Sequence, residues 1–453
     1  MPPSPTATTR RFRAPWIIFW VALGLRLACI IIGRTYHVRA IDDHFGIGWE
    51  MGRIARSLAL GQGFANPFNG HSGPSAWTTP LYPLIMAGTF KLFGIYTDAS
   101  AFVLLAINSV FSAAICPAVY ELAARCCDAT GIARRQSRHA EPLALWSAWL
   151  WAAHPAALQY AIHWIWEMSL STCLFTWAIV LALRLRRIGD APNSPLDPEP
   201  WTLNPRTWAA FGLLWGLLAL SNPSLLLCLP ATLIWVLWPG LRAPQTLPRA
   251  IAGAALTSII FAAILAPWVV RNAITLHAFI PTRSELGIEF YESVLPSHGG
   301  LPWGTTLPLW PGDPEFKQFI QMGEVSFSHM RADQAKAIVR AHPETFLRYT
   351  LDRFLYFWDG TPHPPDRHPT QEYLRQLSYA FISLCGLLGL GLALQRRVPG
   401  AALVALMFLL VPIPYYLITA GPRFRHPIEP LIAILAVYLF RSTTPRPTQQ
   451  EPA

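Results

Sequence analysis

The feature that most constrains this chain is a series of ten apolar stretches spread over almost its whole length. A helix needs about 20 apolar residues to cross a bilayer, and shorter helices are tolerated inside a bundle. Charged residues make up only 13% of the sequence, whereas soluble domains usually carry about 25%. The sequence therefore predicts an all-α integral membrane protein with about ten transmembrane helices. The predicted spans are residues 15–34, 99–124, 142–158, 162–184, 207–221, 223–239, 249–270, 377–395, 399–419 and 427–441.

Basic residues predict the orientation of these spans. The formal net charge is +10, and in membrane proteins such an excess collects in cytoplasmic loops. With ten spans, both termini and the most basic loops fall on one side, which is then the cytoplasmic side. Counting the apolar stretch 80–93 as an eleventh span would break this pattern, so it is predicted to be an interfacial or re-entrant helix outside. No nucleic-acid-binding motif accompanies the positive charge.

Two long segments between spans, residues 35–98 and 271–376, fall on the outer side in this topology. Neither has the features of an independent soluble domain, so residues 1–441 are predicted to form a single membrane domain, with a cytoplasmic tail at 442–453. Each segment carries an apolar stripe at helical spacing, which is typical of a helix lying in the membrane plane. The stripes are Ile47, Met51, Ile54 and Leu58, opposite Glu50, Arg53 and Ser57, and then Leu347, Leu351, Phe354 and Trp358.

Three arginines lie on the predicted outer side, although basic residues otherwise collect on the cytoplasmic side. Arg271 follows the seventh predicted span, and Arg423 and Arg425 lie in the short loop before the last one. A guanidinium pairs with phosphate oxygens through two parallel hydrogen bonds, so the three residues are candidates for a phosphate clamp. The alternative is that each arginine reaches towards lipid headgroups or forms a structural ion pair.

Acidic residues in the first long segment are the candidates for catalysis. Asp42, Asp43 and Glu50 precede Arg53 and Arg56, and a carboxylate can deprotonate an attacking hydroxyl. The simpler interpretation makes the two aspartates a solvated helix cap and pairs Glu50 with Arg53 one turn later.

The second long segment adds Arg283 and Glu289, and His426 follows Arg425. Solvated loop charges are the simpler interpretation of the acidic residues, and His426 is a candidate to hydrogen-bond a phosphate or sugar. None of these residues has the spacing of a metal site, so no cofactor is predicted and a divalent cation is left open.

Four stretches of the sequence together resemble the GT-C superfamily of polytopic glycosyltransferases, in particular the group of protein O-mannosyltransferases and lipid A aminoarabinose transferases. The stretches are Arg53–Leu58 with Gly61–Phe64, Thr79–Leu84 with Lys91–Gly94, Pro267–Asn272 with Phe279–Pro281 and Arg283–Ser284, and Arg423–Pro427 with Glu429–Pro430. Their order and spacing cover nearly the whole chain.

The resemblance implies an enzyme of the bacterial cytoplasmic (inner) membrane whose active site faces outwards. A polyprenyl-phosphate-linked sugar would be the donor, and a hydroxyl of a lipid, glycan or protein acceptor would attack with inversion. The family's essential carboxylate lies in the first outer loop, and its register falls near Ile47, between Asp43 and Glu50. Arg271, Arg423 and Arg425 match the family's basic positions near the lipid phosphate.

Two other classes of protein fit the same composition. A transporter or lipid-carrier flippase would place ionisable groups near the bilayer midplane and show repeat symmetry. The predicted spans are instead nearly free of charge, with Arg26 as the main exception. A non-catalytic assembly subunit of the cell envelope would also suit the two long outer segments. The charges gathered on one face favour the enzyme.

Overall fold

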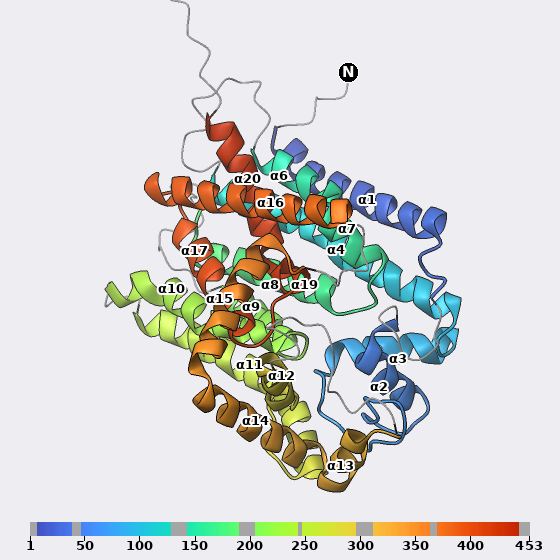
Figure 1. Ribbon diagram of the computed structural model, residues 1–453. Coiled ribbons are helices and arrows are strands. Elements are labelled where there is room, and N and C mark those ends of the chain that lie inside the picture. The colour runs from blue at the N-terminus through green and yellow to red at the C-terminus, as the bar shows by residue number, and fades with distance from the viewer. Residues whose placement is uncertain are drawn as a thin grey trace, which may run out of the picture.

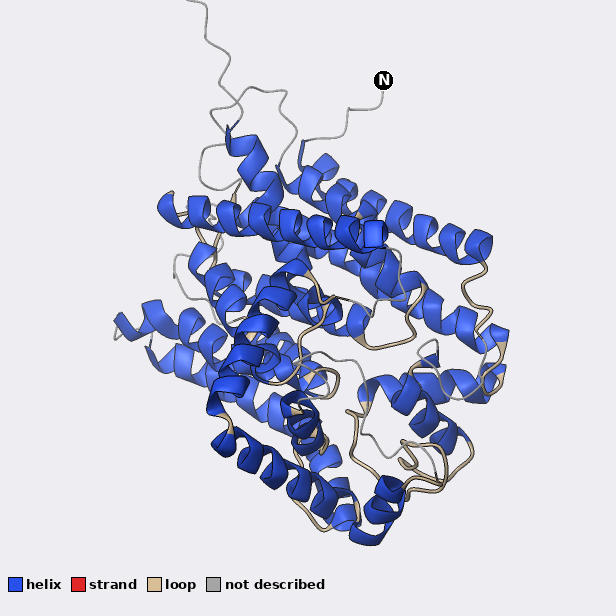
Figure 2. Ribbon diagram, in the orientation of Figure 1, coloured by secondary structure: helices blue, strands red, loops and turns tan. Residues whose placement is uncertain are grey.

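The structure, a computed structural model, describes residues 7–38, 47–127, 143–189, 204–242, 247–295, 311–362 and 369–443. Within these ranges the regular secondary structure is helical, and there is no β-strand apart from one isolated bridge between Ala65 and Pro74 (Figure 2). The prediction of an all-α protein is therefore confirmed.

Six helices in the described part of the chain are long and apolar enough to cross a membrane, by their length and composition. Each corresponds to one of the predicted spans. They are α1 (Ala7–Gly33), α4 (Asp98–Cys126), α8 (Met168–Leu185), the 3-10 helix η3 (Pro223–Leu227) continued by α10 (Cys228–Arg242), α11 (Leu247–Leu276) and α16 (Pro369–Gln395).

The other four predicted spans are shorter or interrupted helices. Proline explains the first interruption, because Pro155 lacks the N–H that would continue the preceding helix, and the backbone of His154 is extended there. The helices are α6 (Leu143–Ala153) with α7 (Pro155–Ile162), α9 (Pro205–Ala219), α17 (Ala401–Leu410) with α18 (Ile413–Leu417), and finally α19 (Pro422–Arg425), η5 (His426–Ile428) and α20 (Glu429–Thr443). The chain is thus a multi-pass membrane protein whose spans differ in length.

The bundle is organised around α4, which packs against α1, α6 and α8 (Figure 1). Two further pairs are formed by α9 with α11 and by α16 with α20. In the last pair the backbones approach closely, since a Cβ at Gly389 would lie 2.3 Å from the carbonyl oxygen of Leu435. Small residues allow such close packing between membrane helices.

Arg26 is the charged residue that the sequence places inside the first span. It is fully buried, and its guanidinium donates to the carbonyl oxygens of Ala22 and Ala152 at 3.0 and 3.1 Å and to Ser112 Oγ at 3.1 Å. It therefore packs against α4 and α6 rather than facing lipid.

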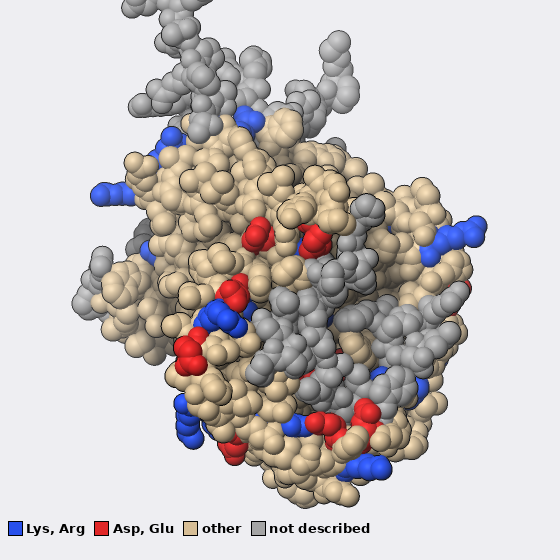
Figure 3. All heavy atoms as spheres, viewed as in Figure 1, with Lys and Arg blue, Asp and Glu red and all other residues tan. Residues whose placement is uncertain are grey.

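The surface of the bundle carries many exposed apolar side chains. Trp20, Ile32, Ile259 and Leu377 are each more than 60% exposed. The face of the molecule in Figure 3 shows wide areas without acidic or basic residues. Such a surface is stable in contact with lipid and would be unfavourable in water.

The first long segment contains α2 (Trp49–Ala59) and α3 (Leu81–Phe93), which pack against each other. Of the apolar stripe, Ile47, Met51 and Ile54 are buried and Leu58 is half-buried. The polar residues Glu50, Arg53 and Ser57 are buried as well. The loop after α2 covers this polar side, where Arg53 Nη1 donates to the carbonyl oxygen of Pro67 at 3.1 Å. Helix α2 is thus enclosed by protein, where the stripe alone indicated a helix in the membrane plane.

The second long segment forms α12 (Leu286–Val294), α13 (Pro314–Met322), α14 (Glu324–Ala341) and α15 (Pro343–Asp359) (Figure 1). Leu347, Leu351 and Phe354 on α15 are 47–59% exposed, as the stripe predicts for a helix with an apolar outer face. Trp358, the last member of that stripe, turns inwards, and its indole N–H donates to Tyr416 Oη at 2.8 Å.

A buried carboxylate joins the two long segments. Glu324, at the start of α14, accepts hydrogen bonds from Ser75 Oγ at 2.6 Å, from the backbone N–H of Ala76 at 2.7 Å and from Ser284 Oγ at 2.6 Å. Each buried hydrogen bond of this kind satisfies a group that would otherwise be costly to remove from water. The first long segment is therefore fastened to α14 and to the chain that follows α11.

Candidate functional site

Arg423, in the short helix α19, is the half-buried member of the predicted arginine set in the last loop. Its guanidinium carbon lies 4.9 Å from the centre of the Trp166 ring and 4.8 Å from that of Phe424. An arginine over an aromatic face keeps its hydrogen-bonding edge available, because the attraction acts through the plane of the guanidinium. This edge makes Arg423 suited to hold an anion.

Glu50 is a carboxylate close enough to interact electrostatically with Arg423. It occupies the first turn of α2 and is 9% exposed. Burial raises the pKa of the Glu50 carboxyl, and the positive charges of Arg53 and Arg423 work against that rise. The structure thus brings together one of the predicted catalytic carboxylates and one of the predicted phosphate-binding arginines.

Glu167 also interacts electrostatically with Arg423, and it lies in the loop between α7 and α8. Burial raises its pKa to about 7, with Arg423 and Arg283 near enough to oppose the shift. Its Oε2 atom is buried and has no hydrogen-bond partner among the described residues. A carboxylate with a pKa close to neutrality and a free oxygen has the properties of a general base.

The loop that carries Glu167 is held rigidly from α4. Asn108 Nδ2 donates to the carbonyl oxygens of Trp164 and Trp166 at 2.9 and 3.4 Å. Asn108 is itself oriented by Tyr82 on α3, whose hydroxyl donates to Asn108 Oδ1 at 3.1 Å. Helices α3 and α4 therefore fix the backbone on which Glu167 is presented.

Arg283 and Glu289 enter the same cluster from the second long segment. Arg283 forms ion pairs with Glu285 and, at 3.2 Å, with Glu289. Arg283 is also within electrostatic reach of Glu167, and Glu289 within reach of Glu50. We refer to Glu50, Glu167, Arg283, Glu289 and Arg423 as the charged cluster.

Arg271 lies elsewhere, in the penultimate turn of α11, and has protein partners. Its guanidinium donates to the carbonyl oxygens of Ser75 and Phe64 at 2.5 and 2.6 Å and to Asn272 Oδ1 at 2.9 Å. It also lies over the rings of Phe64 and Trp268. These contacts place Arg271 beside the Glu324 junction, where it fastens the first long segment to α11.

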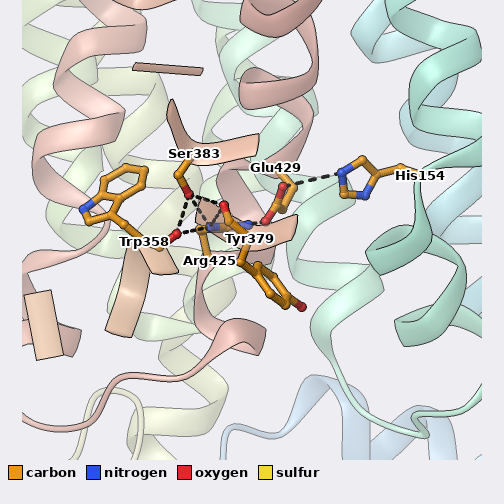
Figure 4. Close-up of polar contacts among 6 residues, drawn as sticks. All are labelled: His154, Trp358, Tyr379, Ser383, Arg425 and Glu429. Carbon is orange, nitrogen blue, oxygen red and sulfur yellow. Dashed lines mark hydrogen bonds and ion pairs between the residues drawn. The ribbon is translucent and has the colours of Figure 1, made fainter. Parts of the chain in front are cut away.

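Arg425 and His426 are buried beneath Arg423, at 1% and 0% exposure. Arg425 forms an ion pair with Glu429 at 2.6 Å and donates to Ser383 Oγ and to the carbonyl oxygen of Trp358 (Figure 4). The His426 ring lies 4.7 Å from the ring of Tyr160. Both residues contact other helices of the bundle, so Arg423 is the residue of the three that belongs to the charged cluster.

The remaining predicted residues are on α2 or outside the described ranges. Arg53 is buried and contacts the loop after α2, and half-buried Arg56 lies in the last turn of the same helix. Asp42 and Asp43 belong to residues 39–46, which lie outside the described part of the chain. Their role as catalytic carboxylates remains a prediction. In the ranges that the structure describes, no three His, Cys, Asp or Glu side chains are grouped so that they could hold a metal ion.

Comparison with solved structures shows which fold this site belongs to. The chain is similar to the archaeal oligosaccharyltransferase AglB from Archaeoglobus fulgidus in complex with an inhibitory peptide and a dolichol-phosphate, with a TM-score of 0.54 and 14% identity, over 97% of this chain and 51% of that one. It is similar also to the apo form of the Archaeoglobus fulgidus oligosaccharyltransferase, with a TM-score of 0.52 and 13% identity, over 95% and 50% of the two chains. The chain thus spans about half the length of these enzymes.

A match to ArnT from Cupriavidus metallidurans bound to undecaprenyl phosphate has 15% identity over 96% of this chain and 77% of that one, and its TM-score of 0.35 adds nothing to the assignment. No family model matches the sequence, and no curated protein matches it either. The chain shares its fold with these oligosaccharyltransferase structures, in keeping with the resemblance predicted from the four sequence stretches.

Proposed function

We propose that this protein is a membrane glycosyltransferase that transfers a sugar from a polyprenyl-phosphate carrier to an acceptor hydroxyl. The observation that carries the proposal is the electrostatic interaction of buried Glu50 and half-buried Glu167 with the guanidinium of Arg423, which lies over the Trp166 ring. This reaction needs a carboxylate to receive the acceptor proton and a cation to stabilise the departing phosphate. The dolichol-phosphate in the similar oligosaccharyltransferase structure supports a carrier of this class.

In the proposed reaction the acceptor oxygen forms a bond to the anomeric carbon of the sugar while the bond from that carbon to the phosphate oxygen breaks. The acceptor proton passes to a carboxylate, and the electron pair of the broken bond leaves on the polyprenyl phosphate. Arg423 stabilises the phosphate, because its charge is fixed and its aromatic partners hold it in place. Attack opposite the leaving group gives inversion.

Glu167 is the carboxylate that we assign as base among the described residues. Its pKa of about 7 lets it be ionised before the reaction and accept a proton during it. Glu50 is the more deeply buried of the two acids and would orient the acceptor. Asp43 keeps its place as a further candidate from the sequence.

The cellular setting is part of the same proposal. The protein would lie in a bacterial cytoplasmic (inner) membrane, with both termini in the cytoplasm and the charged cluster on the outer side. The acceptor would be a lipid, a glycan or a protein.

Sugar transfer by the purified full-length chain tests the assignment of the base. We would supply a panel of polyprenyl-phosphate sugars with envelope acceptors to the wild type and to the variants Glu167→Gln, Glu50→Gln and Asp43→Asn. Removing a general base costs about 10²–10⁴-fold in rate, so Glu167→Gln should lose at least about 100-fold. Glu344→Gln on α15 is the control, since Glu344 is exposed. Full activity of Glu167→Gln with loss in Asp43→Asn would move the role to Asp43.

A transporter remains the alternative function. Transport would require charged groups along a path across the bundle, whereas the charged cluster belongs to the loops and short helices at one end of the spans. Uptake of a labelled carrier lipid into proteoliposomes, without transfer of its sugar, would favour the transporter.

A further inference from the structure

The buried ion pair between Arg425 and Glu429 contacts two regions of the chain that meet at the charged cluster. One region is the loop and short helix that carry Arg423. The other is the interrupted helix α6–α7, which leads into the loop with Trp166 and Glu167. The two regions are joined deep in the bundle by the pair and at its end by the contact of Arg423 with Trp166.

Arg425 connects its own short helix to α15, α16 and α20. Its Nε atom donates to Glu429 Oε1 at 2.6 Å, and Nη1 donates to Ser383 Oγ at 2.6 Å and to the carbonyl oxygen of Trp358 at 2.9 Å (Figure 4). A four-residue helix such as α19 has no stability of its own, because forming its first turn costs more than it gains. The position of Arg423, two residues earlier, therefore depends on the contacts of Arg425.

Glu429 extends the connection to the break between α6 and α7. Its Oε2 atom lies 3.7 Å from His154 Nε2, on the residue where Pro155 interrupts the helix. The ring of His426 adds a second contact to the same region, with its centre 5.6 Å from that of Trp151 and 4.7 Å from that of Tyr160. The His154–Glu429 distance is longer than a hydrogen bond, so the segment that leads to Glu167 packs against the segment that carries Arg423 through these side-chain contacts.

We propose that Arg425, Glu429 and His154 form a positioning unit that sets the geometry of Arg423 against Trp166 and Glu167. None of the three is a member of the charged cluster as defined above. They act by holding the two segments at a fixed separation, so that the cation for the phosphate and the carboxylate for the acceptor keep their relative places. The catalytic part of this inference depends on the proposed function, whereas the structural part does not.

Amide hydrogen exchange of the full-length protein in detergent tests the structural part. In Glu429→Gln we expect exchange to rise at least about tenfold in residues 155–167 and 421–426, since local opening follows the loss of buried contacts. The control is Glu121→Gln, which removes the carboxylate that forms ion pairs with Arg125 and Arg184. Amide exchange in both segments should be unchanged in this variant. Unchanged exchange in the two segments of Glu429→Gln, or an equal rise along the whole chain, would overturn the proposal.

His154→Gln keeps the Arg425–Glu429 pair and alters only its contact with the α6–α7 break, so it decides the question if Glu429→Gln does not fold. Exchange should then rise in residues 155–167 without a general loss of structure. No change there would also overturn the proposal.

Kinetics test the catalytic part. Glu429→Gln should lower kcat at least about tenfold while KM for the carrier changes little, because positioning acts on the reacting geometry. Glu429→Asp, which keeps the charge, should recover part of the loss. When Glu429→Gln is added to the Arg423→Lys variant, kcat should fall no further, since Glu429 acts through Arg423. A further loss of kcat, additive with that of Arg423→Lys, would contradict this role of Glu429. If the wild type transfers no sugar at all, the proposed function fails while hydrogen exchange still decides the positioning unit.

Discussion

The guanidinium carbon of Arg423 lies 4.9 Å from the ring centre of Trp166, immediately before Glu167 in the sequence. This contact brings the loop before the last helix against the loop between α7 and α8. Because the arginine is stacked, its edge stays free for a phosphate while its charge favours the ionised form of Glu167.

Transfer should depend on pH through Glu167. The pKa of this carboxyl is raised by burial from its ordinary value of 4.5 to about 7, and a base acts only when it is deprotonated. The rate should therefore rise between about pH 6 and pH 8, as the ionised fraction grows from about one tenth to about nine tenths. In Glu167→Gln the remaining rate should lose this rise. The measurement is kcat/KM against pH for both proteins, and an unchanged profile in the variant would assign the titration to another group.

Replacing Arg423 by lysine should be almost as harmful as replacing it by alanine. Lysine keeps the charge but lacks the planar guanidinium that stacks on Trp166 and offers two parallel hydrogen bonds. We expect both variants to lose about 100-fold or more in kcat, as is usual when a donor to a developing negative charge is removed. Arg340→Ala, at an exposed position in the last turn of α14, is the matched control. Wild-type rates in Arg423→Lys would show that charge alone suffices.

The junction between the two long segments should be sensitive to the loss of Glu324. Its carboxylate accepts three hydrogen bonds and lies near Arg271. Glu324→Ala leaves these buried donors without a partner, which we expect to cost about 3 kcal/mol or more. In thermal unfolding in detergent, Glu324→Ala should have a clearly lower Tm than Glu344→Ala, because the Glu344 side chain is 72% exposed. Equal melting temperatures would mean that the junction does not hold the segments together.

Helices α16 and α20 should separate when a methyl group is added at Gly389. A Cβ there would lie 2.3 Å from a backbone oxygen of Leu435, which cannot move without shifting α20. Gly389→Ala should therefore destabilise the protein by about 1–3 kcal/mol. The control is Gly391→Ala, since a Cβ at Gly391 would meet nothing within 4 Å. The comparison is made by thermal unfolding of the two variants, and equal stability would show that α16 and α20 are not packed this closely.

The sequence predicts the helical architecture well because long apolar runs leave few alternatives in a membrane. Six predicted spans appear as single long helices, or as η3 continued by α10, and the stretch 80–93 is helical as expected. The break at His154 follows from Pro155, which a hydropathy profile alone does not register.

The charged cluster was accessible to sequence analysis only in part. Glu50, Arg283, Glu289 and Arg423 were all predicted as site residues, and the structure brings them together. Glu167 was missed, because a single acid inside an apolar run is absorbed by the span drawn around it. The sequence signal for Glu167 is its position in an apolar run, shortly after Trp164 and directly after Trp166. A carboxylate in such a run is costly to bury unless it has a partner.

Arg271 and Arg425 show that the distribution of charge along the sequence cannot distinguish a binding arginine from a structural one. Both break the positive-inside pattern, and this alone makes them look like Arg423. Arg271 donates to two backbone carbonyls and to Asn272 Oδ1. Arg425 donates to Glu429, to Ser383 Oγ and to a backbone carbonyl. Which carbonyl oxygens lie within reach of a guanidinium depends on tertiary packing, so the difference between a binding arginine and a structural one becomes visible only in the fold.

The most direct test of the proposed function is the movement of labelled sugar from a polyprenyl-phosphate donor to an acceptor by purified wild type and Arg423→Ala side by side. We expect the wild type to move the label and release polyprenyl phosphate, while the variant stays folded and moves at least about 100-fold less. Equal transfer by both proteins, or no transfer by the wild type with any donor, would contradict the proposed function.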